Sequence, residues 1–594
     1  MLDHRSISDL NVIARTDKQG RSYVRAYKNV WVPKTDTKPG HSKMTEQHHL
    51  GALKPNGRVL ISQKFLERYP EFAGVDWYYY KNRLYDFEAY QQLVPEATED
   101  VIEQPVDETD EALAPTCKHL GASYALCALL NDSGMARSLK EVFGHEDAQL
   151  LMGQAIYNVL GHYSADSFPD WAYMHYLPTD AVCSGQRLSE LFHRITPELM
   201  DQFWVNRYRA LKEKAYQSNV PRYCLIDSTS ISTQSTTIEQ AEFGHAKQNP
   251  EYKQVNLTIV MDQFNGEIIY ACESHGSIND ANMVKFVCER MKRIGFELSD
   301  FSFIADRGYG GVPNLSMLIR EKIPFVIGAV ITRDSVLEQN LFKHQKALKG
   351  YRSFDYRMGV SAVTTEEKFE GDHTVYTHYY CDQQKAALEC QQWRGKLLRV
   401  LDLKNNDKPV PANEWVQVKG LLKAYKVGDK TASEQHKQMQ TRWKIDEDRW
   451  DQLEARAGCF AIQTDVYRDP IETLRIYRLR NLIEVGFDSF KNACNGDRLR
   501  CSSYGYYGKL LCYLLAESLM MMIYDAAKKE VEAKGDKAVK IPGNSVKAML
   551  LKLDKIQMRR VSINHKWVVD AVTKTQLLWL KTFFKIKALP KSIW

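Results

Sequence analysis

Short apolar runs bounded by polar residues or glycine recur through the middle of the chain and predict buried strands. These runs lie at residues 222–229, 255–261, 268–272, 301–309 and 324–330. Asn265-Gly266, a hairpin-turn dipeptide, joins the second run to the third. Helical stretches at 281–295 and 314–321 separate the later strands. The order strand, hairpin, helix, strand, helix, strand predicts a mixed α/β sheet.

A longer amphipathic pattern at residues 470–492 predicts one helix. Asp469 suits its N-cap, Pro470 its first position, and Glu472 the capping box. At about 100° per residue, four polar residues fall within roughly 60° of arc. They are Tyr477, Arg480, Glu484 and Lys491. An apolar arc beside them comprises Ile476, Leu479, Ile483, Phe487 and Phe490.

This polar stripe has two interpretations. A surface helix with ordinary ion pairs among Arg480, Glu484 and Lys491 is the simpler one. A carboxylate held at the rim of a buried face between two cations is the other. That arrangement suits a metal-binding acid with phosphate-binding neighbours.

Two aspartates close apolar runs upstream of this helix. Asp227 follows RYCLI, and Asp306 follows FSFIA. An aspartate that starts a turn is the common alternative at such a position. If both runs are strands, each acid sits where a strand meets solvent, and three acids become available to one site.

The motifs around these acids resemble those of a known family. Tyr-x2-Arg-x3-Glu-x6-Lys on the helix, Asp-Ser-Thr at Asp227 and Asp-Arg-Gly-Tyr at Asp306 are similar to the IS-four superfamily of bacterial DDE transposases, encoded by insertion sequences. The resemblance implies a ribonuclease-H-like core with Asp227, Asp306 and Glu484 as catalytic acids. They would bind two Mg²⁺ ions, which Mn²⁺ could replace. Tyr477, Arg480 and Lys491 would contact DNA.

The same resemblance sets the expected function. We expect cut-and-paste cleavage and joining at terminal inverted repeats, insertion into target DNA, a homodimer on paired ends, and no membrane partner. The expected location is the bacterial cytoplasm, in association with the nucleoid when DNA is bound. Two alternatives stay open: a nuclease on the same core, and a domesticated DNA-binding protein without catalysis.

The predicted core is interrupted. The strand at 459–464 leads into the motif helix, so residues 331–458 are surplus and predict a partly β inserted domain. Within it, 376–380, 397–401 and 415–418 read as strands, whereas 431–443 and 446–456 read as helices. Trp443 and Trp450 are candidates for stacking on a flipped base, with packing inside the insertion as the alternative.

Other segments surround the core. We predict an N-terminal β-containing module for DNA-end recognition, an acidic linker, a helical bundle, both parts of the core around the insertion, and a C-terminal helical tail. Their predicted limits are 1–93, 94–115, 116–217, 218–330, 459–527 and 528–594.

Charge and composition fit a protein that binds a polyanion. The net charge is +6, but residues 94–115 carry eight acids and no bases, so the remainder is near +14. The twelve cysteines include no CxxC pair, which argues against a zinc ribbon and suggests a reducing compartment. Gly308, Gly310 and Gly311 lack the GK[ST] of a phosphate loop, so nucleotide hydrolysis is not supported.

Overall fold

A computed structural model of the chain divides into two compact units, Met1–Ala114 and Pro115–Trp594. The boundary falls at the end of the predicted acidic linker, most of which lies outside the described residues. The structure describes residues 10–17, 22–34, 40–54, 57–94, 117–161, 165–177, 184–215, 222–244, 251–278, 283–369, 371–428, 439–466, 468–494, 496–560 and 567–593.

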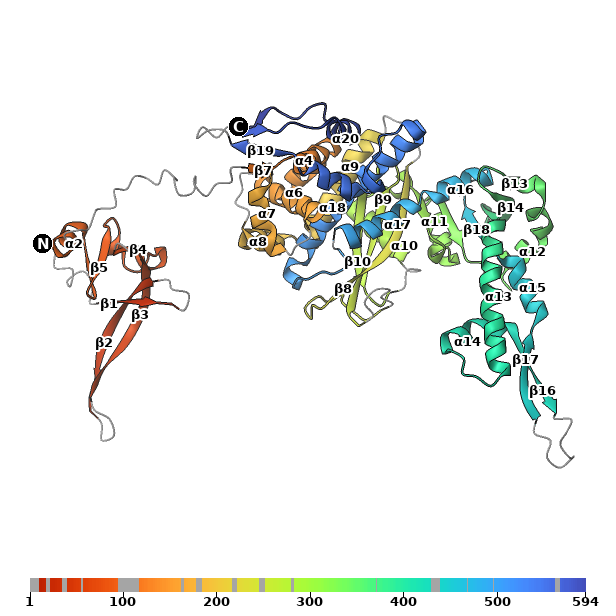
Figure 1. The fold of residues 1–594 in the computed structure, drawn as a ribbon, viewed down its shortest axis with the longest axis horizontal. Coiled ribbons are helices and arrows are strands. Elements are labelled where there is room, and N and C mark those ends of the chain that lie inside the picture. Colours follow the sequence, from red (N-terminus) through yellow and green to blue (C-terminus); the bar gives the residue numbers. More distant parts are fainter. Residues whose placement is uncertain are drawn as a thin grey trace. The chain divides into compact units, whose positions relative to one another are not determined.

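The first unit is a six-stranded antiparallel sheet in sequential order (Figure 1). Its elements are β1 (Asn11–Thr16), β2 (Ser22–Val32), β3 (His41–Leu53), β4 (Arg58–Ile61), α1 (Gln63–Leu66), β5 (Trp77–Tyr80), β6 (Arg83–Tyr85) and α2 (Phe87–Leu93). Trp77 is buried, and its indole N–H donates to the carbonyl of Phe72 at 3.0 Å. The unit therefore has a core of its own.

The second unit is built on a nine-stranded sheet with the order β10-β9-β8-β11-β12-β18-β15-β14-β13. Its strands are β8 (Tyr223–Thr233), β9 (Lys253–Asp262), β10 (Ile268–His275), β11 (Ser302–Ala305), β12 (Phe325–Ala329), β13 (Phe354–Asp355), β14 (Val360–Phe369), β15 (His373–Cys381) and β18 (Cys459–Thr464).

The first five strands of this sheet follow the predicted arrangement. β9 runs antiparallel to its two neighbours, β8 and β10. β11 pairs in parallel with both β8 and β12. Gly266 has a φ of 74° in the turn between β9 and β10, a conformation that glycine adopts without strain. These five strands form the mixed sheet that the sequence predicts.

Helices lie against this sheet and form a separate bundle. The bundle comprises α4 (Gly121–Ser133), α5 (Met135–Phe143), α6 (His145–Leu160), α7 (Phe168–Met174), α8 (Gly185–Arg194) and α9 (Pro197–Ala215). Two further helices, α10 (Met283–Ile294) and α11 (Val312–Arg320), lie between strands of the core in the sequence. Among the described residues of the predicted 116–217 segment, helices are the main elements and β7 (Cys117–His119) is a strand.

One long apolar helix fills the space between bundle and sheet. α18 (Tyr506–Lys534) packs against α6, α8 and β10. By length and composition alone the stretch Ser503–Lys537 could cross a membrane, but 83% of its most apolar part is buried inside the protein. Its hydrophobic side chains are therefore accounted for by packing within the unit.

A buried ion pair fastens the bundle to the sheet. Arg207 on α9 and Glu267 before β10 have side chains 0% and 1% exposed, and the Arg207 Nε donates to Glu267 Oε1 at 2.8 Å. Arg207 also donates to the carbonyl of Ser133 at 3.1 Å. Burial raises the pKa of Glu267, while Arg207 opposes that shift. Each charge is therefore stable in the interior only because the other is present.

The predicted insertion at 331–458 is only partly a separate body. Strands β13 to β15 extend the core sheet beyond β18, and α12 (Val336–Leu348) lies beside them. The remainder has a small core of its own, formed by α13 (Gln383–Asn405), α14 (Ala412–Val418), β16 (Leu422–Gly428), β17 (Met439–Ile445) and α15 (Glu447–Arg456).

Three assignments within the insertion were wrong. Residues 397–401 belong to α13 and residues 415–418 to α14, because a short apolar run does not distinguish a strand from a buried helix. Residues 439–443 form part of β17 rather than a helix, and 431–438 lie outside the described residues. The strand at 376–380 and the helix at 446–456 are confirmed by β15 and by α15 with Asp446 as its N-cap.

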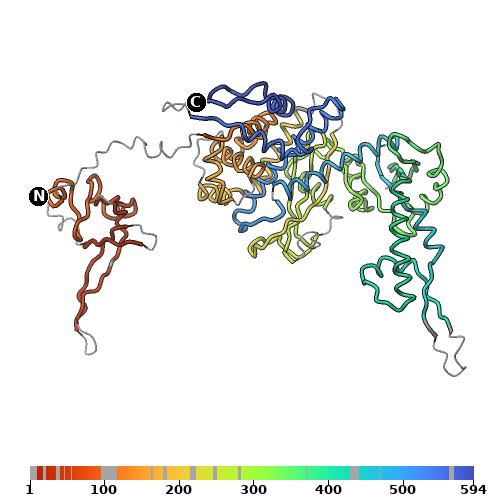
Figure 2. Tube along the Cα trace, viewed as in Figure 1, coloured from red at the N-terminus to blue at the C-terminus, as the bar shows by residue number. Residues whose placement is uncertain are grey.

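The predicted helical tail at 528–594 also needs correction. After α18 the chain forms α19 (Val546–Leu553) and α20 (Lys574–Phe584), but also β19 (Gln557–Arg560), β20 (Trp567–Val569) and β21 (Ser592–Ile593). These strands make a four-stranded sheet with β7, so the end of the chain runs beside the bundle (Figure 2). The tail is a mixed element that completes the second unit.

Removing one charge of the buried pair should destabilise the second unit strongly. Glu267→Gln leaves the Arg207 guanidinium buried without its counter-charge, at an expected cost of about 3–5 kcal/mol in the free energy of unfolding. Urea unfolding followed by far-UV circular dichroism measures the change. Glu141→Gln is the matched control, since its ion pair with Arg137 is exposed and should contribute nothing measurable. Equal unfolding midpoints for both variants would contradict this account.

Candidate active site

The register of two parallel strands brings Asp227 and Asp306 together. Ala305, the last residue of β11, pairs with Ile226 of β8, so the two aspartates are the next residues on neighbouring strands. Asp227 accepts from the backbone N–H of Ser228 at 2.8 Å, and Asp306 accepts from that of Arg307 at 2.7 Å. The sheet itself therefore places the two carboxylates side by side.

One detail of the strand prediction was wrong. Asp227 does not end its strand, because β8 continues to Thr233 in pairing with β9. What ends at this level is β11, so its pairing with β8 stops at Ile226, and on that side β8 is next bridged at Ser232, by Arg498. Asp227 is accessible because the neighbouring strand β11 ends beside it, and not because its own strand β8 ends there.

The motif helix is also different from the prediction, since it is not one continuous α-helix. It consists of α16 (Pro470–Arg478), α17 (Asn481–Asp488) and a π-helical turn, η8 (Ser489–Ala493). Asp469 caps it as expected, accepting from the N–H groups of Ile471 and Glu472. Across the break, the N–H groups of residues 479, 480, 482 and 483 each bond to the carbonyl three residues earlier. This is a 3₁₀-type tightening of the helix.

The tight turn aligns Tyr477 with Arg480, because residues three apart eclipse one another in 3₁₀ geometry. The Arg480 guanidinium lies 5.7 Å from the centre of the Tyr477 ring. The Tyr477 hydroxyl donates to Asp306 Oδ1 at 3.3 Å. Burial raises the pKa of Tyr477 to about 12, with Arg480 opposing the shift, so the phenol keeps its proton at neutral pH.

Arg480 stands at the centre of the three predicted catalytic acids. Its guanidinium nitrogens lie 2.7 Å from Glu484 Oε1, 3.9 Å from Asp306 Oδ1 and 3.9 Å from Asp227 Oδ2. The contacts to Asp306 and Glu484 share one nitrogen, so the two oxygens are no farther apart than those two distances together. Residues far apart in the sequence therefore converge on one cation.

The exposure of these groups is graded. The Arg480 side chain is 15% exposed, that of Asp227 19%, that of Asp306 38% and that of Glu484 51%. Burial lowers the pKa of Arg480, but the surrounding acids and Tyr477 outweigh it, and the net shift is upward. The guanidinium thus stays charged and neutralises a cluster of acids that opens to solvent at Glu484.

Lys491 occupies a different part of the motif. It lies on the π-helical turn η8 and is partly buried. The contacts around the Arg480 guanidinium are made by Asp227, Asp306, Tyr477 and Glu484.

The structure adds residues that the sequence did not single out. Tyr309 is 1% exposed. Its hydroxyl donates a hydrogen bond to Ser228 Oγ at 2.8 Å and lies within hydrogen-bond distance, 3.4 Å, of Asp227 Oδ1. Gly328 on β12 lies so close that a Cβ there would be 2.5 Å from the Tyr477 hydroxyl. Tyr309 belongs to the Asp-Arg-Gly-Tyr motif, which was a usable signal, whereas Gly328 becomes visible only through packing.

A cavity of about 790 Å³ begins beside Asp306 and extends to the insertion. Arg307, Gly328 and Tyr477 line its core side, and charged residues of both signs with one indole line the other. The latter include Arg333, Glu338, Lys385, Glu389, Trp393, Arg449 and Arg456. Trp443 and Trp450, the predicted stacking candidates, instead pack onto the small core of the insertion. Trp393 is the tryptophan that faces the cavity.

A buried carboxyl lies beneath the motif helix. Glu517 on α18 is 0% exposed, and a Cβ at Gly486 of α17 would lie 3.3 Å from its Oε1. Burial raises the pKa of Glu517 well above its usual range, and Ser489 opposes the shift only in part. Burial therefore favours the protonated form of this carboxyl, which lies against α17.

One family model matches the core of the second unit. Residues 219–505 match the family described as Transposase DDE domain. A cryo-EM structure of the piggyBac transposase synaptic complex with hairpin DNA is 11% identical, with 69% of this chain and 70% of that chain covered and a TM-score of 0.32. A likeness at that level defines neither fold nor function. No curated protein matches the chain.

Replacing the buried acid should change how stability depends on pH. A raised pKa in the folded state means that only the unfolded chain releases this proton as the pH rises above the usual glutamate range. Stability of the wild type therefore falls there, by at most about 1.4 kcal/mol per pH unit. Glu517→Gln removes that loss, so its urea midpoint relative to wild type should rise from pH 5 to pH 8.

Met521→Leu, a volume-conserving change at the same contact with Gly486, is the control for repacking. It should shift the midpoint equally at both pH values. Parallel stability profiles for Glu517→Gln and wild type would refute the neutral-acid assignment.

Proposed function

We propose that this chain is a DNA transposase that cleaves and joins phosphodiesters at the ends of an insertion sequence, by a cut-and-paste route. The DDE-domain match supports the class. The observation that carries the catalytic assignment is the convergence of Asp227, Asp306 and Glu484 on the Arg480 guanidinium. Three carboxylates held this close need positive charge among them, and Arg480 stands where cations are required.

The donor set fits divalent cations. Carboxylate oxygens are the ligands that Mg²⁺ prefers, and Mn²⁺ accepts the same donors. Asp227, Asp306 and Glu484 would hold two such ions. When bound, the ions would supply Lewis-acid stabilisation of the charge that develops on the phosphate.

The protein residues then divide the remaining work. The Tyr309 hydroxyl and the backbone of Ser228 hold Asp227 in place. Arg480, released from its carboxylates, would bind a phosphate oxygen, and Tyr477 would donate to the DNA backbone instead of Asp306. Lys491 would contact a phosphate farther along the same strand.

No nucleophilic side chain is needed for either chemical step. Water attacks the phosphodiester at the element end, which breaks the P–O3′ bond and leaves a 5′-phosphate and a free 3′-hydroxyl. That hydroxyl attacks a target phosphodiester, forming the new P–O bond while the target 3′-oxygen departs. We further propose terminal repeats and target DNA as substrates, a homodimer that holds two ends, and action at the bacterial nucleoid. The first unit is proposed to recognise the ends.

Loss of one acid should abolish chemistry but not DNA binding. Glu484→Gln and Asp306→Asn should each lower Mg²⁺-dependent nicking of a plasmid carrying the element ends by a hundredfold or more, roughly the loss seen for removing one transition-state contact. Glu472→Gln, an exposed glutamate on α16 away from the three acids, is the matched control and should keep full activity. An unchanged nicking rate in Glu484→Gln would contradict the proposal.

The same assay separates the alternatives when an acceptor plasmid is added. Joined products identify a transposase, cleavage without joining identifies a nuclease, and end binding without either identifies a non-catalytic DNA-binding protein. The last two outcomes reject the proposed function.

A methyl group placed beside Tyr477 should disturb the site without removing any functional group. In Gly328→Ala the added Cβ would lie 2.5 Å from the Tyr477 hydroxyl and 2.9 Å from the Arg307 nitrogen, so one of them must move. We expect a loss of about tenfold or more in nicking, since a displacement near 1 Å has effects of this size or larger. Gly395→Ala on α13, where nothing lies within 4 Å, should retain activity. Equal activity of both variants would show that the position of Tyr477 is unimportant.

A further inference from the structure

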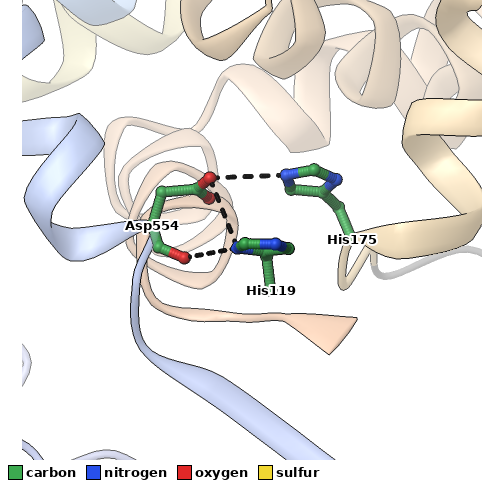
Figure 3. A group of neighbouring side chains, drawn as sticks. All are labelled: His119, His175 and Asp554. Carbon is green, nitrogen blue, oxygen red and sulfur yellow. Dashed lines mark hydrogen bonds and ion pairs between the residues drawn. The ribbon is translucent and has the colours of Figure 1, made fainter. Parts of the chain in front are cut away.

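Two histidines and an aspartate meet at a point far from the three acids in the sequence (Figure 3). His119 ends β7, His175 follows α7, and Asp554 follows α19. One ligand atom from each lies within 4.8 Å of the other two. The cluster therefore joins three segments that are brought together only by the fold.

The Asp554 carboxylate lies at distances from both imidazole rings that coordination of a single ion would also produce. His175 Nε2 lies 3.4 Å from Asp554 Oδ2, and His119 Nδ1 lies 3.6 Å from the same oxygen. A good N–H···O bond is shorter, about 2.9–3.0 Å. Two ligands of one tetrahedral Zn²⁺, each about 2.0–2.1 Å from the ion, are roughly 3.4 Å apart. The Oδ2 atom thus stands at ligand spacing from both rings.

The surroundings orient His175 as a ligand. Its Nδ1–H donates to the carbonyl of Trp171 at 2.7 Å, and its ring stacks on the Trp171 indole with centroids 4.0 Å apart. A neutral ring bonded in this way turns the lone pair of Nε2 toward Asp554. His175 is 8% exposed, whereas the side chains of His119 and Asp554 are 33% and 17% exposed, so the cluster opens to solvent at His119. A cation between the His175 ring and the Asp554 carboxylate would satisfy both groups.

Asp554 itself is incompletely satisfied. Its Oδ1 atom is buried and has no hydrogen-bond partner among the residues that the structure describes. A buried carboxylate oxygen without a partner is costly, because its desolvation is not compensated. The unpaired oxygen belongs to the carboxylate whose other oxygen, Oδ2, both histidines face, and Lys547 is the cation near this carboxylate.

We propose that His119, His175 and Asp554 form a Zn²⁺ site, with water completing the coordination. Imidazole nitrogens favour Zn²⁺ over Mg²⁺, so the donors distinguish this site from the all-carboxylate cluster at Arg480. His119 now bonds through Nδ1 to the Asp554 carbonyl at 2.8 Å. To bind the ion through Nδ1 it exchanges that bond for coordination and carries its proton on Nε2.

The position of the site indicates what the ion would do. β7 pairs with β19, His119 lying opposite Gln557, and the N–H of Tyr176 bonds to the His119 carbonyl at 2.7 Å. An ion at this point would fasten the first strand of the second unit to α7 and to the C-terminal segment. The site would be structural and independent of the proposed chemistry.

Metal binding by the full-length protein tests this proposal. Protein stripped with a chelator and dialysed against Zn²⁺ should retain about one ion per chain, and Co²⁺ in its place should give the visible absorption bands of a site with nitrogen ligands. His175→Gln should weaken Zn²⁺ binding at least tenfold. His119→Gln, on the more exposed strand β7, gives a second reading if the first variant fails to fold.

Two control variants make the result specific. His373 faces a single aspartate, Asp465, at 3.8 Å, so His373→Gln should leave Zn²⁺ binding unchanged. Glu484→Gln should also retain the ion, which separates this site from the three acids. No bound Zn²⁺, or stoichiometry and Co²⁺ spectra that are the same in wild type, His175→Gln and His119→Gln, would overturn the proposal and leave an ordinary histidine–aspartate contact.

Discussion

Repulsion among three carboxylates is the constraint that shapes the centre of this protein. Asp227, Asp306 and Glu484 could not lie around one point as anions without a cation between them. Arg480 supplies that charge, and the acids in turn hold it in its charged form despite burial. The folded protein can therefore hold the three carboxylates close together, although their mutual repulsion alone would push them apart.

The same arrangement implies an exchange when ligands arrive. Ions entering the carboxylate cluster would displace Arg480, and a freed guanidinium beside a metal-bound phosphate is well placed for a bidentate contact. The 3₁₀ turn at residues 479–483 lies where such a movement would begin, since Arg480 sits at the junction of α16 and α17. In a continuous α-helix, the position of Arg480 would be fixed by the hydrogen bonds of α16.

Sequence patterns predicted the core well because its constraints are local. Buried parallel strands are continuous apolar runs, so β8, β11 and β12 could be predicted from the sequence, whereas their adjacency is a finding of the structure. The convergence of Asp227, Asp306 and Glu484 was an expectation from motif resemblance, and the geometry around Arg480 agrees with it. The breaks in the motif helix could not be read, because α and 3₁₀ turns share the same residue preferences.

Failures occurred where distant segments decide the outcome. The run 397–401 is helical because Leu397 and Val400 pack together on one face of α13 with Val418 of α14. The strands of the C-terminal tail were missed because the partner of β19 is β7, which lies more than four hundred residues away along the chain. The contact of His119 and His175 with Asp554 has no spacing signature for the same reason.

The pairing of β7 with β19 also has a consequence for biosynthesis. The bundle that begins at Gly121 packs against α18, and the strand before it, β7, pairs with β19 at residues 557–559. A ribosome must therefore have translated nearly the entire polypeptide before this unit can close. Until then the apolar faces of α4 and α6 have no α18 to cover them, and long-range closure of this kind is slow. Nascent chains would depend on protection from chaperones during most of their synthesis.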